Sequence, residues 1–214
     1  HYSDWINSRM NGIIKYIKPE AISGKTLFEI GGGYGHIGNR FHELGATVIT
    51  SDARIEHLNK VNTLYPHIET MLFDGDKNEL TSTYDIILHW GVLYHLSEIE
   101  NHLSKLLTKC NILLLETEVS DSDDDTFFVK LQEDGYDQAF NNMGIRPSPN
   151  YIERILTNNG FNFLLIKDPI LNSTFHKYDW EINNTKTWKA GRRRFWICWK
   201  NIDSPVRDMG VQII

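Results

Sequence analysis

The glycine-rich stretch 31–35 (GGGYG) is the part of the chain whose residue types and spacing most directly indicate chemistry. It follows the apolar run 27–30 and precedes a helical pattern that begins at His36. Glycine reaches positive φ at little cost, and it has no Cβ to hold a ligand away from the backbone. The exposed N–H groups at a helix start favour a negatively charged ligand group. The stretch therefore predicts a strand, a tight turn and a helix that together bind a nucleotide-like ligand.

Two sequence patterns overlap in this stretch. Residues 33–38 (GYGHIG) fit the G-x-G-x-x-G fingerprint of dinucleotide sites, and residues 29–35 (EIGGGYG) fit E-x-G-x-G-x-G. An acid just before the first glycine is unfavourable beside an anionic pyrophosphate, whereas it suits a ligand that carries positive charge. Glu29 therefore favours a ligand with a cationic end over a dinucleotide.

Other polar residues with candidate chemistry lie at the carboxyl ends of the expected strands. In an open α/β sheet the ligand lies beyond those ends, beside the first strand. Asp52 follows the second expected strand, where a carboxylate can accept hydrogen bonds from the hydroxyls of a ribose. The remaining candidates at strand ends are Asp74, Asp76, His89, Trp90, Tyr94, His95, Glu116 and Glu118.

Alternating strands and helices must position these residues. Short runs rich in β-branched and apolar residues predict strands at 25–30, 46–50, 68–73, 84–88, 111–116, 161–166 and 194–200. Helical patterns lie between most of them, at 35–45, 54–65, 96–108 and 151–159. The alternation indicates an α/β fold, a Rossmann-like three-layer sandwich with mostly parallel strands and helices on both faces.

A further helix is predicted at 2–18, before the first strand, and Pro19 ends it. We therefore divide the chain into an N-terminal helical segment, 1–24, and one domain, 25–214. Residues 120–150 are too many for an ordinary connection in a compact domain. We interpret them as a partly helical lid or substrate-recognition insertion, in which the acidic run 121–125 is a solvated loop.

The composition narrows the functional classes. The 214 residues are 41% hydrophobic and 23% charged, which is typical of one globular domain. The sequence shows no apolar run of transmembrane length and no secretory signal, so we expect a cytoplasmic protein without a membrane partner. Cys110 and Cys198 lie in apolar runs and are expected to be buried free thiols, and no residues have convincing metal-ligand spacing. The net charge of −6 disfavours a nucleic-acid partner but leaves one open.

Three segments in combination resemble the class I S-adenosylmethionine-dependent methyltransferases. They are the turn 29–35, the segment 75–80 (GDKNEL), which is similar to a G-D-x-x-x-L segment of that class, and the run 84–96 (YDIILHWGVLYHL), which is similar to its fourth-strand motif. The resemblance covers about residues 26–200. It implies S-adenosylmethionine as methyl donor, S-adenosylhomocysteine (SAH) as product, and a seven-stranded sheet whose last strand is antiparallel.

The same resemblance implies which residues bind the donor. They lie at the turn, at the end of the second strand, after the third strand, where Asp76 or Asp74 would bind the adenine amino group, and at the end of the fourth strand. The expected set is Glu29, Gly31, Gly33, Gly35, Asp52, Ala53, Asp74, Gly75, Asp76, His89 and Trp90.

Methyl transfer requires alignment of the nucleophile with the methyl group, and a general base only where the nucleophile must lose a proton early. His95 is the first candidate for that base, because imidazole titrates near neutral pH. Tyr94 and Glu116 are further catalytic candidates, and the other candidate bases are His89, Glu118 and His176. The expected acceptor is a hydroxyl or amine of a small molecule or saccharide.

Three alternatives remain open from the sequence. Segments 91–95, 114–118 and 147–150 are similar to the tRNA wobble-uridine carboxymethyltransferases, which would use a carboxylated donor, although the acidic charge of this chain departs from them. An NAD-dependent oxidoreductase and a non-catalytic binding module with the same fold are the other two. The basic run 192–194 is interpreted as a charged entry to the last strand, with binding of an acidic substrate as its alternative.

Overall fold

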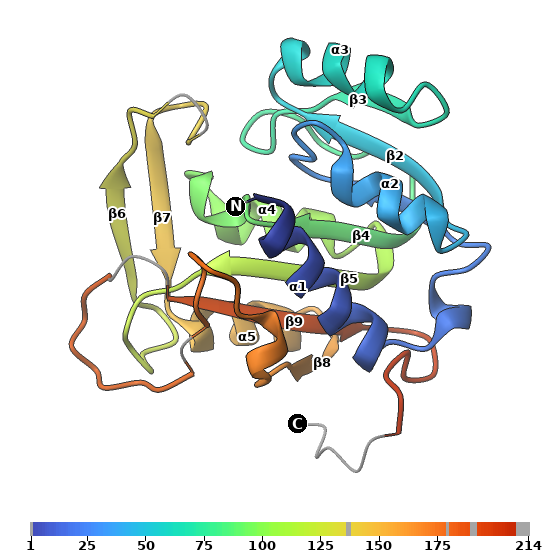
Figure 1. Ribbon diagram of the computed structural model, residues 1–214. Helices are drawn as coiled ribbons and strands as arrows, with labels where there is room; N and C mark the ends of the chain where they lie inside the picture. Colours follow the sequence, from blue (N-terminus) through green and yellow to red (C-terminus); the bar gives the residue numbers. More distant parts are fainter. Residues whose placement is uncertain (1, 136–137, 179, 189–191, 209–214) are drawn as a thin grey trace.

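The computed structural model describes residues 2–135, 138–178, 180–188 and 192–208 (Figure 1). A seven-stranded sheet in the order β3-β2-β1-β4-β5-β9-β8 forms the centre. Its strands are β1 (Thr26–Glu29), β2 (Thr47–Asp52), β3 (Glu69–Leu72), β4 (Tyr84–Trp90), β5 (Cys110–Glu118), β8 (Asn162–Leu165) and β9 (Arg193–Trp199). The first five pair in parallel, whereas β9 runs antiparallel to both β5 and β8. The predicted sheet with its antiparallel last strand is confirmed; the end of the predicted domain, 209–214, lies outside the described residues.

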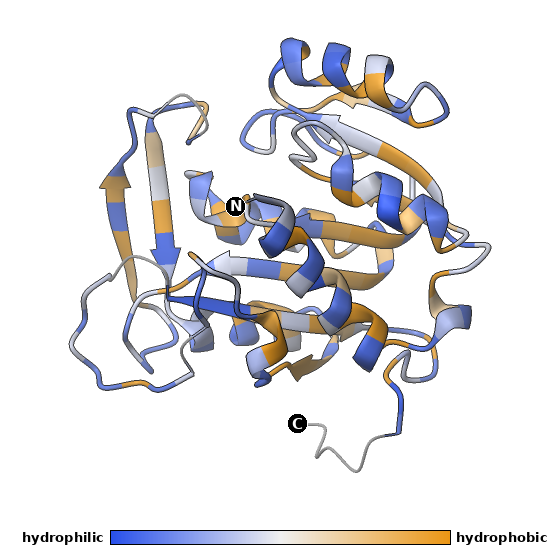
Figure 2. Ribbon diagram, in the orientation of Figure 1, coloured by the Kyte–Doolittle hydropathy of each residue, from blue (hydrophilic) through white to orange (hydrophobic). Residues whose placement is uncertain are grey.

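Helices cover both faces of this sheet, so the predicted three-layer sandwich is also confirmed. Successive residues of a strand point to opposite faces, and Leu27 and Phe28 accordingly belong to two different apolar cores. One core includes residues of α1 (Tyr2–Tyr16), α2 (His36–Glu43) and α3 (Ile55–Leu64), and the other includes residues of α4 (Ile99–Leu106) and α5 (Pro149–Asn158). Figure 2 shows the apolar middle of the central strands between these helices. None of the helices in the described segments has the length and apolar character needed to cross a bilayer.

Two central strands extend further than the sequence predicts. The pairing of β4 with β5 continues through His89 opposite Leu115 and Trp90 opposite Glu116. His89, Trp90 and Glu118 therefore lie within strands rather than after them, and Glu116 lies inside β5 instead of at its end. A short helical turn, η2 (Leu93–His95), follows β4, so α4 begins later than predicted. Two other such turns, η1 (Pro19–Ala21) and η3 (Pro169–Leu171), lie in connections.

The α1 helix packs against the sheet through one apolar side. Its buried residues Trp5, Ile6, Met10 and Ile13 recur at helical spacing. Several of them join the core formed with β4, β5 and β9. The α1 helix also contacts the connection between β8 and β9, because Ser8 donates a hydrogen bond of 3.0 Å to the carbonyl of Asn172. The N-terminal segment is thus an integral part of the sandwich.

The predicted partly helical insertion is wrong in its secondary structure. Its described residues contain β6 (Phe128–Gln132) and β7 (Met143–Pro147), which pair antiparallel as a separate hairpin. This hairpin stands beside the end of the central sheet in Figure 1. The α5 helix begins at Pro149, earlier than predicted, because the Ser148 hydroxyl caps it by accepting a 3.0 Å hydrogen bond from the Tyr151 N–H.

The acidic run 121–125 differs from its predicted solvated state at Asp121, which is buried, whereas Asp123 and Asp125 are exposed as predicted. The Asp121 carboxylate accepts hydrogen bonds from the Asn183 N–H (2.8 Å) and the Thr185 hydroxyl (2.6 Å), and it lies 3.5 Å from the guanidinium of Arg192. The basic run 192–194 is buried as well. Cys110 and Cys198 are buried free thiols as predicted.

Candidate active site

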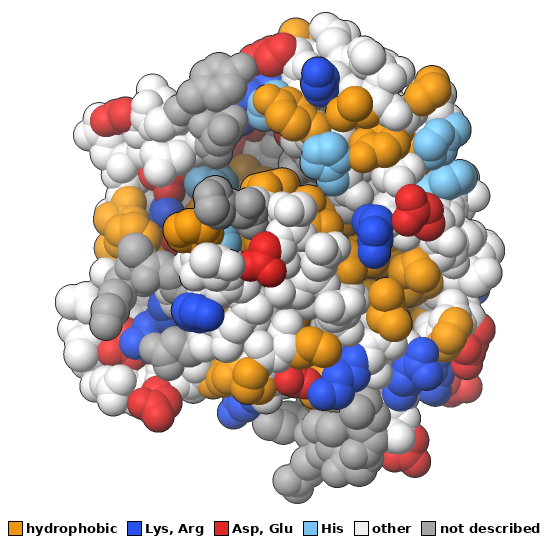
Figure 3. All heavy atoms as spheres, in the orientation of Figure 1, with side chains coloured by type: hydrophobic (Ala, Val, Ile, Leu, Met, Phe, Trp, Pro, Cys, Tyr) orange, Lys and Arg blue, Asp and Glu red, His pale blue; other side chains and the backbone are white. Residues whose placement is uncertain are grey.

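A cavity of about 520 Å³ opens beyond the carboxyl ends of β1, β2 and β4. Figure 3 shows the hollow in this face of the molecule. Residues of α1, the glycine turn, η2 and the loop between β6 and β7 complete its lining. The predicted site residues that line it are Gly31, Gly33, Asp52, Ala53, Asp74, Gly75, Asp76, Trp90, Tyr94 and His95.

The glycine turn has the backbone that its sequence predicts. Gly31 (φ 63°) and Gly33 (φ 56°) lie in the left-handed region that other residues rarely adopt. A Cβ at Gly31 would lie 2.4 Å from Val92, whereas a Cβ at Gly33 would meet no atom within 4 Å. Gly33 therefore leaves open space for a ligand. Gly35 caps α2 and does not line the cavity; a Cβ there would lie 3.0 Å from Val61, so this glycine permits helix packing instead of donor contact.

Glu29 lies beneath the turn rather than in the cavity, which corrects its expected contact with a cationic ligand end. Its buried carboxylate accepts hydrogen bonds from the Thr50 hydroxyl (2.7 Å) and the Gly38 N–H. A Cβ at either Gly32 or Gly38 would lie 2.5 Å from its Oε2, so the two glycines close over it. Burial raises the pKa of Glu29 to about 7, against the opposing effect of these hydrogen bonds. Glu29 thus supports the turn from below.

Asp52 lies where the sequence predicts a ribose-binding carboxylate. Its Oδ2 accepts a hydrogen bond from the Gly33 N–H (3.0 Å), its Oδ1 accepts one from the Arg54 N–H (2.9 Å), and His57 Nδ1 lies 3.2 Å from Oδ1. An ionised carboxylate offers about four acceptor positions. Asp52 is therefore held in place and retains capacity for hydroxyl donors from the cavity.

The segment after β3 forms the next part of the wall. Asp76 Oδ2 accepts a hydrogen bond from the Asn141 side chain (2.9 Å), and Asp74 Oδ1 accepts one from the Asp76 N–H (3.0 Å). Both carboxylates line the cavity, and apolar side chains flank them at Ile30, Phe73 and Leu96. A planar base with an exocyclic amine matches this combination of apolar walls and acceptors.

His89 lies on the other side of its strand, away from the cavity, so the expected donor contact and the role as base are corrected. Its fully buried Nε2 lies 2.9 Å from Nε2 of His102, whose Nδ1 lies 2.9 Å from the carbonyl of Gly75. Burial lowers the pKa of His89 well below its usual value and that of His102 to about 4. Both rings are therefore neutral near pH 7, and together they brace the Gly75 turn.

Tyr94 and His95 adjoin each other at the far end of the cavity, with ring centroids 4.0 Å apart. Tyr94 Oη accepts a hydrogen bond from Arg193 Nη2 (3.1 Å). Burial raises the pKa of Tyr94, so the phenol keeps its proton near pH 7. His95 Nδ1 is paired with the carboxylate of Glu133, which follows β6. These two predicted residues are therefore held by partners that the sequence analysis did not identify as site residues.

Arg9 is a site residue that the sequence analysis missed. It is 1% exposed, its guanidinium lies 3.6 Å from the ring centroid of Trp5 and 5.4 Å from that of Trp90, and it lines the cavity. Its Nε and Nη2 have no hydrogen-bond partner within the described parts of the chain. An arginine on the apolar side of the helix predicted at 2–18 was the signal that could have revealed it.

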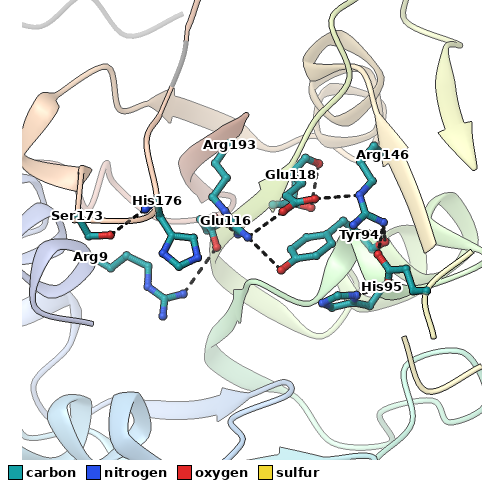
Figure 4. Close-up of polar contacts among 11 residues, drawn as sticks. Arg9, Tyr94, His95, Glu116, Glu118, Arg146, Ser173, His176 and Arg193 are labelled. Carbon is teal, nitrogen blue, oxygen red and sulfur yellow. Dashed lines mark hydrogen bonds and ion pairs between the residues drawn. The ribbon is translucent and has the colours of Figure 1, made fainter. Parts of the chain in front are cut away.

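A row of alternating charges runs from Arg9, which lines the cavity, to Arg146, as Figure 4 shows. Glu116 pairs with Arg193 (2.8 Å) and Arg9 (3.7 Å), and Glu118 pairs with Arg193 (3.0 Å) and Arg146 (2.9 Å). Glu116 is fully buried and does not line the cavity. Its predicted catalytic role is therefore corrected to a structural one, and Glu118 has the same surroundings.

His176 also lies outside the cavity lining. It stacks on Trp5 with ring centroids 3.8 Å apart, and burial lowers its pKa to about 4. Among the described residues, no group of His, Cys, Asp and Glu side chains is arranged to hold a metal ion. His95 is thus the predicted base that the structure brings into the cavity.

Comparisons with known proteins agree with this geometry. The profile of a family described as "Methyltransferase domain" matches residues 2–166. No curated protein sequence matches the chain. A similar solved structure is the N-terminal domain of EvdMO1 in the presence of SAH and D-fucose, with 15% sequence identity and a TM-score of 0.69 over 94% of this chain and 83% of that chain.

Two further solved structures are similar at the level of the fold. The 1,6-didemethyltoxoflavin-N1-methyltransferase of Burkholderia thailandensis, with its acceptor and SAH bound, has 13% identity and a TM-score of 0.60 over 94% of this chain and 81% of that chain. The magnesium protoporphyrin IX methyltransferase of Synechocystis PCC 6803, with S-adenosylmethionine bound, has 14% identity and a TM-score of 0.60 over 92% of this chain and 78% of that chain.

Proposed function

This chain belongs to the class I S-adenosylmethionine-dependent methyltransferases, and from that premise we propose that it methylates a hydroxyl or an amine of a small molecule or a saccharide. The observation that carries the proposal is that His95 lines the same cavity as the residues suited to the donor. A base at that place serves an acceptor that must lose a proton, as a hydroxyl or an amine does.

The lining offers candidate partners for the carboxylate, the ribose and the adenine of the donor. Arg9 would bind the carboxylate of the methionine end, because its partnerless buried Nε and Nη2 suit an anion. Asp52 would accept hydrogen bonds from the ribose hydroxyls, and Asp76 or Asp74 from the adenine amine. S-adenosylmethionine supplies, when bound, a methyl group activated by its sulfonium.

His95 would act on the acceptor. No residue that the structure describes hydrogen-bonds to its Nε2, so this nitrogen can take a proton from the cavity. It would receive the proton of the acceptor hydroxyl or amine as the new C–O or C–N bond forms and the C–S bond of the donor breaks, which leaves SAH. Tyr94, which keeps its proton near pH 7, would orient the acceptor beside His95.

The nature of the acceptor is supported by the surroundings of the cavity. Gln138 and Phe140, from the loop between β6 and β7, also line it, and the Gln138 carbonyl accepts a 2.9 Å hydrogen bond from Arg54 there. The net charge of −6 gives little attraction for a phosphate backbone. One similar structure was determined in the presence of D-fucose and another has 1,6-didemethyltoxoflavin bound, and both compounds are small molecules. A small acceptor agrees with each of these observations.

The proposal is tested by following a labelled methyl group from the donor into monosaccharides, nucleoside-diphosphate sugars, phenols and amines, with total RNA in parallel. We expect label in a small molecule, and His95→Ala should lower kcat by ~10²-fold or more. The control His67→Ala changes an exposed histidine outside the cavity and should keep the wild-type rate. Label in RNA alone, or no transfer to any acceptor by a protein that binds SAH, would overturn the proposal.

A further inference from the structure

Glu133 joins three parts of the molecule through one buried carboxylate. It follows β6, and its side chain is 4% exposed. The carboxylate pairs with His95 Nδ1 and with Arg146 Nη1, and its Oε2 also accepts a hydrogen bond of 3.0 Å from the Ala139 N–H. Glu133 therefore links η2, β7 and the loop that covers the cavity.

The carboxylate is ionised in this environment. Burial would raise the pKa of Glu133, but the hydrogen bond and the charge of His95, together with the charge and hydrogen bond of Arg146, outweigh burial and hold this pKa below its usual value. An ionised carboxylate can only accept hydrogen bonds. His95 Nδ1 must therefore donate, which leaves the lone pair of a neutral imidazole on Nε2.

Arg146 fixes Glu133 from the other side. Its Nε donates to Glu118 Oε2 (2.9 Å), its Nη1 donates to the carbonyl of Tyr94 (3.2 Å), and its guanidinium lies 4.8 Å from the Tyr94 ring. Among the described residues, Glu133 and Tyr94 contact His95, Arg146 contacts both of these, Arg193 contacts Tyr94, and Glu118 lies one contact further away. Glu133 is the one of these that contacts its imidazole nitrogen.

We propose that Glu133 is a positioning residue, which holds His95 as the Nδ1–H tautomer with Nε2 toward the acceptor and stabilises the imidazolium that forms when Nε2 takes the acceptor proton. The proton stays on His95, and Glu133 remains a carboxylate throughout. The inference rests on the proposed function, in which His95 is the base. It also gives the β6–β7 hairpin a second role, because the segment that covers the cavity also orients the base.

Kinetic measurements on conservative variants of Glu133 test this role. Glu133→Gln keeps the shape but removes the charge, and we expect it to lower kcat ~10-fold or more while KM for the acceptor and the Kd for SAH change less than about two-fold. The acid limb of the kcat profile should move to lower pH, because the imidazolium loses its neighbouring negative charge. Glu133→Asp should recover part of kcat. Asp134→Asn, an exposed acid of the same hairpin, is the matched control and should match the wild type.

The ¹⁵N NMR signals of His95 in the wild-type protein provide a second test, which does not depend on the folding of any variant. We expect the Nδ1–H tautomer near pH 8. The Nε2–H tautomer, or a Glu133→Gln variant with the wild-type kcat and pH profile, would overturn the inference. So would a loss of SAH affinity as large as the loss of kcat, since that indicates a purely structural role. Wild-type kcat in His95→Ala would instead overturn the proposed function itself.

Discussion

The carboxylate of Asp52 accepts a hydrogen bond from the backbone N–H of Gly33 at 3.0 Å, which ties the end of β2 to the glycine turn beside the cavity. The same carboxylate lines the cavity where the ribose of the donor is expected. One side chain therefore both shapes the turn and offers acceptors to the ligand.

Asp52→Ala should weaken SAH binding by roughly 10- to 100-fold, because the variant loses charge-assisted hydrogen bonds to the ribose and to the turn. Isothermal titration calorimetry measures the change. Asp203→Ala removes an exposed acid outside the cavity and should bind SAH as the wild type does. Equal affinities of Asp52→Ala and Asp203→Ala would contradict this assignment.

Arg9→Met should weaken SAH binding about 10-fold or more but leave the affinity for 5′-methylthioadenosine unchanged, because that compound lacks the amino-acid end that Arg9 would bind. Arg9→Lys keeps the charge without the planar fork and should fall between the wild type and Arg9→Met. Fluorescence or calorimetric titration with both ligands checks this pattern. A similar loss for both ligands would show that Arg9 only maintains the fold, and no loss for SAH would place the carboxylate elsewhere.

Glu29→Gln should flatten the dependence of stability on pH. The pKa of Glu29 in the folded protein, about 7, lies above its usual value, so the folded state binds this proton more tightly than the unfolded state does. The resulting stabilisation is complete below the usual pKa and is lost as the pH rises through 7. Between pH 5 and 8 the wild type should lose roughly 1–3 kcal/mol more unfolding free energy than Glu29→Gln.

Urea unfolding across that pH range measures the contribution of Glu29 to the unfolding free energy. Glu20→Gln, which changes an exposed acid, is the control. SAH affinity at pH 6 should stay within a few-fold of the wild type, since Glu29 does not line the cavity. Parallel stability profiles for the wild type and Glu29→Gln, or a large loss of SAH affinity, would contradict the position of Glu29 beneath the turn.

Arg193→Met should destabilise the protein by about 3–5 kcal/mol, because Glu116 and Glu118 would be left as buried charges with their principal partner removed. Lys105→Met breaks an exposed pair with Glu79 and should cost no more than about 1 kcal/mol. Chemical unfolding of both variants at neutral pH compares them. A loss in Arg193→Met as small as that in Lys105→Met would mean that the row of charges contributes little to folding.

The sheet, and the gathering of Gly33, Asp52 and Asp76 at one cavity, could be predicted from the sequence, for a physical reason. Buried parallel strands require continuous apolar runs, and a turn such as that at Gly31 and Gly33 requires glycine, so both leave clear patterns. Asp52 and Asp76 follow such strands closely in the chain, and topology alone brings them to one edge. The burial of Glu29 could not be predicted, because a motif does not show whether a strand-end side chain points into the cavity or beneath the turn.

The acceptor end could be predicted only in part. His95 was a candidate base because it follows the fourth strand, but its partner Glu133 comes from the β6–β7 hairpin, whose described strands pair with each other outside the central sheet and have no long apolar run. Arg9 and Arg193 come from the two ends of the chain. Contacts between such distant segments depend on tertiary packing, which neither periodicity nor motif spacing reports. The interpretation of the 192–194 run as a charged strand entry accordingly missed the ion pairs of Arg193 with Glu116 and Glu118.

The central claim is that the cavity at the glycine turn binds a methyl donor and transfers its methyl group. Calorimetric titration of the wild-type protein with SAH and, separately, with NADH tests it most directly. The account predicts saturable binding of one SAH per chain, no binding of NADH, and SAH binding roughly 10- to 100-fold weaker in Asp52→Ala. Saturable binding of NADH without binding of SAH would contradict it.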